Sequence, residues 1–181
     1  DSVIHVWRGH HGPEFAALFA QTFAAGELLV VCPPTLAGPT FVPWLPTGDV
    51  RLAGDWPIGT PSPVRTEPAP AYPERPILGV YTSGTATANV APGDAEAALR
   101  DPGAHPGRLI LYSRANLAAG IGAIAALFDA RRLTAIYAYP QPFHVFGLLL
   151  GYAWAAMAKI PLLSAPGPYG RLSHTAWLAC Q

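Results

Sequence analysis

Two short apolar runs bounded by prolines constrain the fold of this chain more than any other feature. Residues 28–32 read Leu-Leu-Val-Val-Cys and stop at Pro33-Pro34, and residues 76–81 read Pro-Ile-Leu-Gly-Val-Tyr. Strands that are apolar on both faces are typical of parallel sheets, which are covered by other elements on both sides. The two runs therefore predict strands in the middle of a buried sheet.

The segments around these runs alternate between strand and helix patterns. Residues 3–7 alternate like a strand, and from Pro13 onward aromatic residues and leucines recur at helical spacing until Gly26. A strand, helix and strand within about 30 residues form a βαβ unit. Further along, strands are predicted at residues 108–112, 133–139 and 162–163, and helices at residues 117–128, capped by Asn116, and 145–158.

This alternation predicts an α/β fold, with a mainly parallel sheet and helices on both faces. A length of 181 residues is enough for one domain with a real core, so we expect a single α/β domain over residues 1–181. Residues 33–76 hold 12 of the 21 prolines and predict an irregular connection with room for one short strand. Residues 86–107 are also rich in Pro and Gly, around one helical candidate at residues 94–99.

The charges of the chain balance, with 11 basic and 11 acidic side chains. A nucleic-acid-binding protein needs an excess of Lys and Arg, so we expect no nucleic-acid partner. All 11 acids lie in residues 1–129, whereas residues 130–181 hold Arg131, Arg132, Lys159 and Arg171 without an acid. This basic stretch favours an anion or an acidic partner surface, unless it is merely solvated or neutralised by the acidic half of the chain.

The cysteines and the apolar segments indicate where in the cell the protein is located and whether it spans a membrane. Cys32 and Cys180 do not make a disulfide framework, and a reduced, cytoplasmic location is the default expectation. The first residues lack both an initiator Met and a signal-peptide pattern, which indicates a processed or trimmed product. The longest apolar run, residues 145–158, falls short of the roughly 18–20 residues that span a membrane, so it predicts a buried helix and no membrane span.

A cluster of hydroxyl residues and a glycine follows the predicted strand 76–81. Thr82, Ser83, Gly84 and Thr85 combine side-chain donors with a flexible backbone that could wrap a phosphate. The carboxyl ends of strands are where open α/β sheets bind ligands. An ordinary polar turn explains the same residues, and the G-x-x-x-x-G-K-S/T nucleotide signature is absent.

Two other patterns favour structural interpretations. Residues 120–125 match a dinucleotide fingerprint by letter, but they follow no strand and no acid lies about 20 residues later, so we interpret Gly120 and Gly122 as close helix packing. His5, His10 and His11 have no Asp, Glu or Cys at ligand spacing, which favours a strand end and a loop over a metal site.

His144 lies between a proline-rich turn and the start of a predicted helix. Phe143 and Phe146 flank it, so its ring could gate an apolar pocket and contact a polar group there. A capped or solvent-facing histidine is the alternative, which local sequence leaves open.

Three segments in this order resemble the adenylate-forming (AMP-binding) superfamily of acyl- and aryl-CoA synthetases and peptide-synthetase adenylation domains. They are Tyr-Thr-Ser-Gly-Thr at residues 81–85, Arg-Leu-Ile-Leu-Tyr-Ser-Arg-Ala-Asn-Leu at 108–117 and Pro-Phe-His-Val-Phe-Gly-Leu at 142–148. The first βαβ unit is similar too, and residues 35–75 have no counterpart.

The resemblance implies an ATP-dependent ligase that activates an acyl or aryl acid as its adenylate for transfer to a thiol. It implies ATP with Mg²⁺ as cofactor and CoA or a phosphopantetheine carrier as acceptor. The residues that would line the nucleotide phosphates are Thr82, Ser83, Gly84, Thr85 and Arg108. The residues at the acyl pocket would be Phe143, His144, Phe146 and Gly147. We assign no catalytic residue and no metal ligand.

The sequence also departs from the family pattern. Where the family loop continues Thr-Gly-x-Pro-Lys, this chain has Ala86 to Asn89, and about twenty residues precede Arg108, the nearest basic counterpart. Residues 47–51 copy the family's ribose motif ahead of the phosphate loop, and we interpret them as a turn. The chain thus resembles only the N-terminal portion of such an enzyme, and we expect it to be incomplete for adenylation by itself.

Two functions follow from these expectations. In the first, the chain belongs to an acid ligase, as its N-terminal portion or as a truncated homologue. In the second, it is a catalytically degenerate adenylation-like module that docks a carrier protein or a synthetase partner. In either case a partner or oligomer is expected to cover the apolar segment 145–158.

Overall fold

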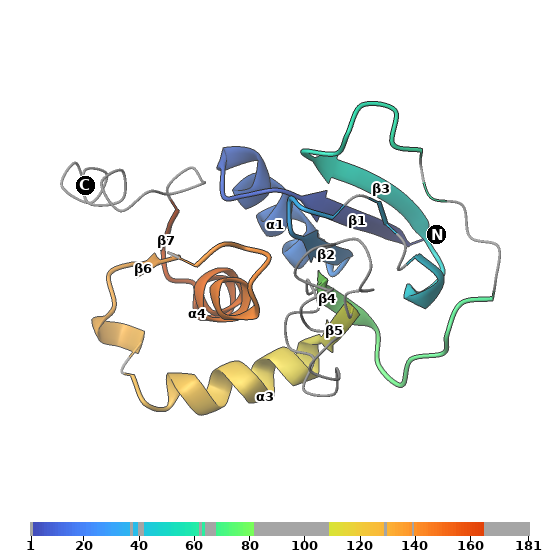
Figure 1. Cartoon of the computed structure of the whole chain (residues 1–181). Coiled ribbons are helices and arrows are strands. Elements are labelled where there is room, and N and C mark those ends of the chain that lie inside the picture. Colours follow the sequence, from blue (N-terminus) through green and yellow to red (C-terminus); the bar gives the residue numbers. More distant parts are fainter. Residues whose placement is uncertain are drawn as a thin grey trace, which may run out of the picture.

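The computed structural model describes residues 2–36, 38–39, 42–61, 63, 68–81, 109–128, 130–138 and 140–164. Within them the chain forms a twisted sheet with helices packed against it (Figure 1). The helical candidate at residues 94–99 lies outside the described residues.

In the described part of the chain, five strands form the main sheet, in the order β3-β1-β2-β4-β5. They are β1 (Val3–Arg8), β2 (Leu28–Cys32), β3 (Asp49–Gly54), β4 (Pro76–Tyr81) and β5 (Leu109–Ser113). The first four run parallel, and β5 pairs antiparallel with β4. The mainly parallel α/β class is therefore confirmed, with one antiparallel edge strand.

The predicted βαβ unit forms as expected. Helix α1 (Pro13–Ala25) begins with a proline whose missing N–H would have had no helical partner, and it ends at Gly26 in the left-handed conformation. Phe15, Phe19 and Phe23 of α1 are buried. The helix carries the chain from β1 to its parallel neighbour β2.

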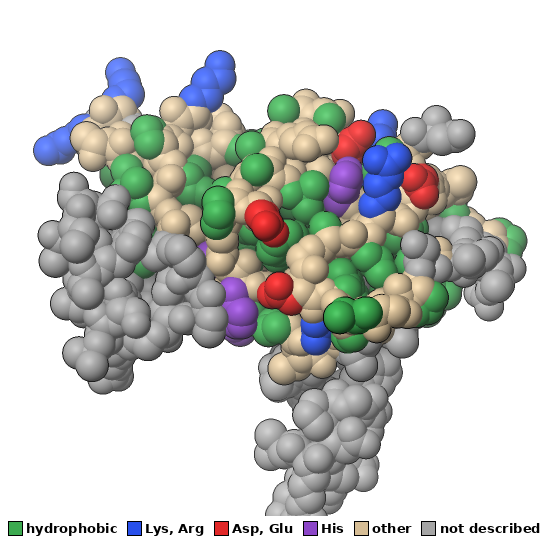
Figure 2. Space-filling model, turned by 90° about the horizontal axis from the view of Figure 1, so that it is seen from above, with side chains coloured by type: hydrophobic (Ala, Val, Ile, Leu, Met, Phe, Trp, Pro, Cys, Tyr) green, Lys and Arg blue, Asp and Glu red, His purple; other side chains and the backbone are tan. Residues whose placement is uncertain are grey.

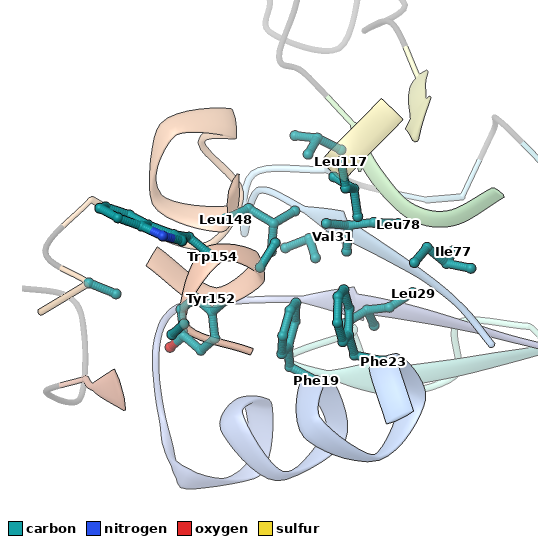
Figure 3. Close-up of a cluster of buried hydrophobic side chains, with 14 of the residues drawn as sticks. Phe19, Phe23, Leu29, Val31, Ile77, Leu78, Leu117, Leu148, Tyr152 and Trp154 are labelled. Atoms are coloured by element: carbon teal, nitrogen blue, oxygen red, sulfur yellow. The ribbon is translucent and has the colours of Figure 1, made fainter. Parts of the chain in front are cut away.

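The helices pack on one face of the sheet. On that face Trp7, Leu29 and Val31 alternate along β1 and β2 and meet apolar side chains of α1, of α3 (Arg114–Ala125) and of the helix at residues 145–158. Figure 3 shows Phe19 and Phe23 of α1 approaching Leu29 and Val31, with Leu117 of α3 and Leu148 completing the cluster.

The opposite face differs from the expectation of helices on both sides. Among the described residues it is covered by the proline-rich connection, through Val42 of the short 3₁₀ turn η1 (Val42–Trp44), Leu45 and Trp56. Prolines lack the N–H that a longer helix would need. The connection also supplies the expected short strand, β3, which begins at Asp49 within the segment that we had interpreted as a turn.

The start of α3 is set by a capping box. The Ser113 hydroxyl accepts from the backbone N–H of Asn116, and the Asn116 side chain accepts from the backbone N–H of Ser113. The predicted cap, Asn116, is therefore the third residue of the helix and Ser113 is the N-cap. A side chain added at Gly120 or Gly122 would meet nothing within 4 Å, which contradicts close helix packing at these glycines.

The apolar run 145–158 is helical along its whole length. Its middle is the π-helical segment η3 (Gly147–Ala153), followed by α4 (Trp154–Ala158). Tyr152 to Ala155 are buried, whereas Val145 and Phe146 are exposed, so most of this segment is already covered within the chain. In the described part of the chain, no helix is both long and apolar enough to cross a lipid bilayer.

A second, two-stranded parallel sheet joins β6 (Ile136–Tyr137) to β7 (Leu162–Leu163). β6 is shorter than the strand predicted at residues 133–139, and a short 3₁₀ turn, η2 (Ala130–Arg132), precedes it. β6 and β7 bracket the helix 145–158 and return the chain to the side of α1 (Figure 1).

Candidate functional site

The phosphate-binding candidates follow β4. Thr82, Ser83, Gly84, Thr85 and Arg108 all lie outside the described residues. The strands on either side of them are described: Tyr81, the last residue of β4, is the register partner of Leu109, the first residue of β5. The last described residue before the candidates and the first one after them therefore lie side by side, at the carboxyl end of β4.

The four acyl-pocket candidates have different surroundings. Gly147 is buried, Phe143 is half-buried, and His144 and Phe146 are exposed. The rings of Phe143 and His144 lie 5.1 Å apart. These residues share one turn and one helix start, but the cavity described below is not lined by any of them.

Gly147 has a clear packing role. A Cβ atom at this position would lie 2.2 Å from the backbone oxygen of Pro140 and 2.6 Å from that of Gln141. Only a residue without a side chain lets the helix approach the Pro140–Gln141 turn so closely.

A buried hydrogen-bond chain connects the carboxyl end of β1 with this turn and with β7. His11 Nε2 lies 2.8 Å from the backbone oxygen of Pro140, and His11 Nδ1 lies 2.7 Å from the Tyr152 hydroxyl. The Tyr152 hydroxyl in turn lies 2.7 Å from Ser164 Oγ. His11 is 4% exposed and Tyr152 1%, and their rings stack with centroids 5.5 Å apart.

The chemistry of these groups fixes the direction of the chain. A carbonyl oxygen only accepts, so His11 Nε2 carries a proton, and in the neutral imidazole Nδ1 is then the acceptor. The Tyr152 hydroxyl donates to Nδ1, which leaves Ser164 Oγ as the donor to Tyr152. Burial raises the pKa of Tyr152 to about 12, with the Ser164 bond acting in the opposite direction, so the phenol keeps its proton at neutral pH.

Neighbouring residues hold His11 in place. The Gln141 side-chain oxygen lies 3.2 Å from His10 Nδ1 and accepts from the backbone N–H of His11 at 3.4 Å. The His10 ring meets the edge of Phe143 with centroids 5.6 Å apart. The 140–144 turn, which includes the first residues of the segment 142–148, is thus joined to the end of β1.

A cavity of about 670 Å³ opens between α1, α4 and β7. Its walls are mostly apolar, with Ala16 and Phe19 from α1 and Ile160 and Leu162 on the opposite side. Its polar lining comes from Tyr152, Lys159 and Ser164. In Figure 3 the Tyr152 hydroxyl oxygen points out of the apolar cluster, away from Phe19 and Phe23. Cavities of this size and composition are typical of small-molecule sites.

Lys159 has an unusual backbone at the rim of this cavity. It ends α4 with φ at 56°, and it is the one non-glycine residue with positive φ in the described ranges. Its side chain is exposed and takes part in neither of the described salt bridges.

The other titratable groups in the described residues form no reactive centre. Burial, opposed by Arg8, raises the pKa of the Cys32 thiol, which makes it a poor nucleophile. His5 Nε2 lies 3.2 Å from the Glu27 carboxylate at the opposite end of the sheet from His11. Across the described ranges, no three His, Cys, Asp or Glu side chains gather to hold a metal ion.

The sequence indicated only part of this arrangement. Tyr152 lies inside an apolar run and Ser164 stands beside a short strand, so neither is marked by a motif. His11 carried one usable signal, because it follows a parallel strand at the edge where such sheets bind ligands. The pairing of these residues depends on contacts between positions 11, 152 and 164, which no local pattern encodes.

Comparison of the chain with protein-family models, with curated proteins and with solved structures gave no match in any of the three.

Proposed function

We propose that this chain is a nucleotide-binding portion of an ATP-dependent ligase that activates a carboxylic acid as its adenylate. Thr82, Ser83, Gly84, Thr85 and Arg108 would contact the phosphates of Mg²⁺-bound ATP. Transfer of a nucleotidyl group depends mainly on positioning and charge stabilisation, which hydroxyl, backbone N–H and guanidinium groups supply. CoA or a phosphopantetheine carrier would be the thiol acceptor.

The pairing of Tyr81 with Leu109 is the observation that carries this proposal. In the sequence, Arg108 lies more than twenty residues after Thr85, which is a large departure from the family pattern. The antiparallel pairing of β4 and β5 makes Tyr81, the residue before the hydroxyl-rich segment, the register partner of Leu109, the residue after the arginine. This pairing supports a phosphate site shared by the two segments.

The location of this point in the fold supports the same proposal. It lies at the carboxyl end of β4, and the parallel strand β1 ends at the same edge of the sheet and is followed by His10 and His11. Ligands of open α/β sheets bind at this edge. The 140–144 turn reaches the same edge through Gln141 and the two histidines.

Calorimetric titration with Mg²⁺-ATP and with a non-hydrolysable acyl-adenylate analogue tests the proposal. We expect saturable binding of both, and a loss of about tenfold to a hundredfold in Thr85→Val and in Arg108→Ala, since each change removes a hydrogen bond to a charged group. Ser164→Ala, which lies in the separate cavity, is the matched control and should bind both ligands normally. Absence of binding at millimolar ligand, or unchanged affinity in both variants, would contradict the nucleotide site.

A second candidate function, the docking module, has an observation of its own. Leu127 and Phe128, at the end of α3, are 79% and 51% exposed, and Arg131 and Arg132 follow in η2 with exposed side chains. Figure 2 shows, at its upper left, Lys and Arg side chains with no acidic side chain of the described residues beside them. An apolar surface with a basic rim suits an acidic partner such as a carrier protein.

Titration with a phosphopantetheinylated carrier domain tests this docking surface. We expect Leu127→Ser and Arg132→Glu to weaken binding, with the charge reversal also reducing the salt dependence. Ile58→Ser is the control, because Ile58 is a fully exposed apolar residue on the loop after β3. Equal binding by all three variants would exclude this surface.

A further inference from the structure

We propose that the cavity between α1, α4 and β7 binds a small apolar molecule through a hydroxyl group on that molecule. A phenol or an alicyclic alcohol is the class of ligand that fits. This proposal does not rest on the proposed nucleotide site, since it is argued only from described cavity-lining residues of α1, of the helix 145–158 and of residues 159–164, and from their hydrogen bonds.

The apolar walls of the cavity indicate that most of the ligand is apolar. Phe19, Ile160 and Leu162 line a space of about 670 Å³ that has room for a body of two or three fused rings. Removing such a body from water is favourable in proportion to its buried apolar area.

The direction of the hydrogen-bond chain determines that the ligand must carry a hydrogen-bond donor. The single proton of Ser164 Oγ is used in the bond to Tyr152, because the proton of Tyr152 is used in the bond to His11. Ser164 therefore offers only lone pairs to the cavity, and a ligand group that meets it must be a donor.

Lys159 adds the complementary requirement. Its ammonium group can only donate, so the ligand must also offer an acceptor. A hydroxyl group does both with one oxygen atom. An ether accepts but does not donate, and an ionised carboxylate would turn its lone pairs toward those of Ser164, so the site should discriminate against both.

Four matched probes test this requirement: 2-naphthol, 2-methoxynaphthalene, naphthalene and 2-naphthoate. Binding to the whole chain is measured by calorimetry at about pH 8, where an unperturbed imidazole is neutral. We expect 2-naphthol to bind about three- to tenfold more tightly than the ether or the hydrocarbon, which is the range for one neutral hydrogen bond, and 2-naphthoate not to exceed the ether.

Tyr152→Phe gives the sharpest test because it keeps the ring and removes the acceptor of Ser164. The Ser164 hydroxyl can then donate as well as accept toward the cavity, so the ether should gain affinity and its disadvantage against 2-naphthol should disappear. A purely structural role for Tyr152 would weaken all probes alike. Ser164→Ala should also abolish the difference between 2-naphthol and the ether, but by weakening 2-naphthol and not by strengthening the ether.

Ala156→Trp locates the binding. Ala156 is an exposed residue of α4 that lines the cavity, so a large side chain there should block all four probes while thermal unfolding shows that the fold is kept. The proposal is overturned if 2-naphthol and the ether bind the unaltered chain equally, if 2-naphthoate binds most tightly, or if Ala156→Trp leaves binding unchanged.

Discussion

At the scale of single residues, Lys159 stands where helices usually place glycine. A left-handed backbone brings the Cβ atom of an L-residue close to the following carbonyl oxygen, whereas glycine adopts it freely. α1 shows the usual solution at its end, with Gly26 at φ 67°. Lys159 adopts the same conformation at φ 56°, and its side chain lines the cavity. Strained backbone of this kind is concentrated at ligand sites, which agrees with a role for the Lys159 side chain in binding.

Two substitutions of Lys159 distinguish the effect of its backbone conformation on stability from the effect of its side chain. We expect Lys159→Gly to raise the free energy of unfolding by about 0.5–1 kcal/mol, because it removes the strain of the left-handed conformation. Lys159→Ala keeps the strain and removes the ammonium, so its stability should not rise. Urea denaturation of the three proteins gives the comparison, and a Gly variant less stable than the Ala variant would contradict the argument.

The residue scale is also where the sequence predicted least. His11 was interpreted as part of a loop, and Tyr152 as part of an apolar helix, and both statements are true locally. Their common role arises because α1 and the helix 145–158 pack on the same face of the sheet. The phosphate-loop residues stay a prediction, since they lie outside the described residues.

At the scale of elements, the sequence predicted the buried strands and the long helix well. β2 and β4 have the predicted bounds, and the helix covers residues 145–158 as expected, because continuous apolar runs ended by Pro or Lys leave few alternatives. The direction of β5 could not be predicted, since periodicity carries no information about which way a strand runs. Its antiparallel pairing is settled by long-range contacts with β4.

Replacing glycine by alanine should have opposite effects on the free energy of unfolding at two helical positions. Gly147→Ala forces a Cβ atom against backbone oxygens of Pro140 and Gln141, which cannot rotate away as a side chain would. We expect a loss of about 1–3 kcal/mol in the free energy of unfolding, typical of overpacking. The shift of the 140–141 turn should also disturb His11, which would appear as a changed ring signal in NMR spectra.

Gly122→Ala is the matched control in α3. The added Cβ atom would meet nothing within 4 Å, and alanine is favoured over glycine inside a helix by about 0.8–1 kcal/mol. We therefore expect this variant to be more stable than the unaltered chain in the same denaturation experiment. Equal effects at positions 122 and 147 would show that backbone contact is not what Gly147 avoids.

At the scale of the whole molecule, the sheet is asymmetric: helices cover one face and an irregular proline-rich connection covers the other. In its described residues the connection has no helix longer than the three-residue turn η1, so other contacts must hold it against the sheet. Arg8, the last residue of β1, does this by donating from Nε to the Leu36 carbonyl at 2.7 Å and from its two terminal nitrogens to the carbonyls of Asp55 and Pro34. Its guanidinium also lies over the Trp56 ring at 5.7 Å.

Removing this guanidinium should destabilise the whole proline-rich connection, which covers the second face of the sheet. We expect Arg8→Gln to lower the free energy of unfolding by about 2–3 kcal/mol, since several charge-assisted hydrogen bonds are lost together. Arg8→Lys should recover only part of the loss, because an ammonium cannot reach three separated carbonyls as a planar fork does. Faster amide hydrogen exchange in residues 35–36 and 54–56, with α1 unchanged, is the expected signature.

Arg51→Gln is the control for this variant. Arg51 is also a strand arginine with one hydrogen-bonded partner, Asp49, at 3.0 Å, but both side chains are 60% exposed. Exposed ion pairs contribute little, so we expect a change below about 0.5 kcal/mol. If Arg8→Gln and Arg51→Gln destabilise the chain equally, the second face is fixed by its apolar contacts, Val42 and Leu45 above all, and the carbonyl contacts of Arg8 are secondary.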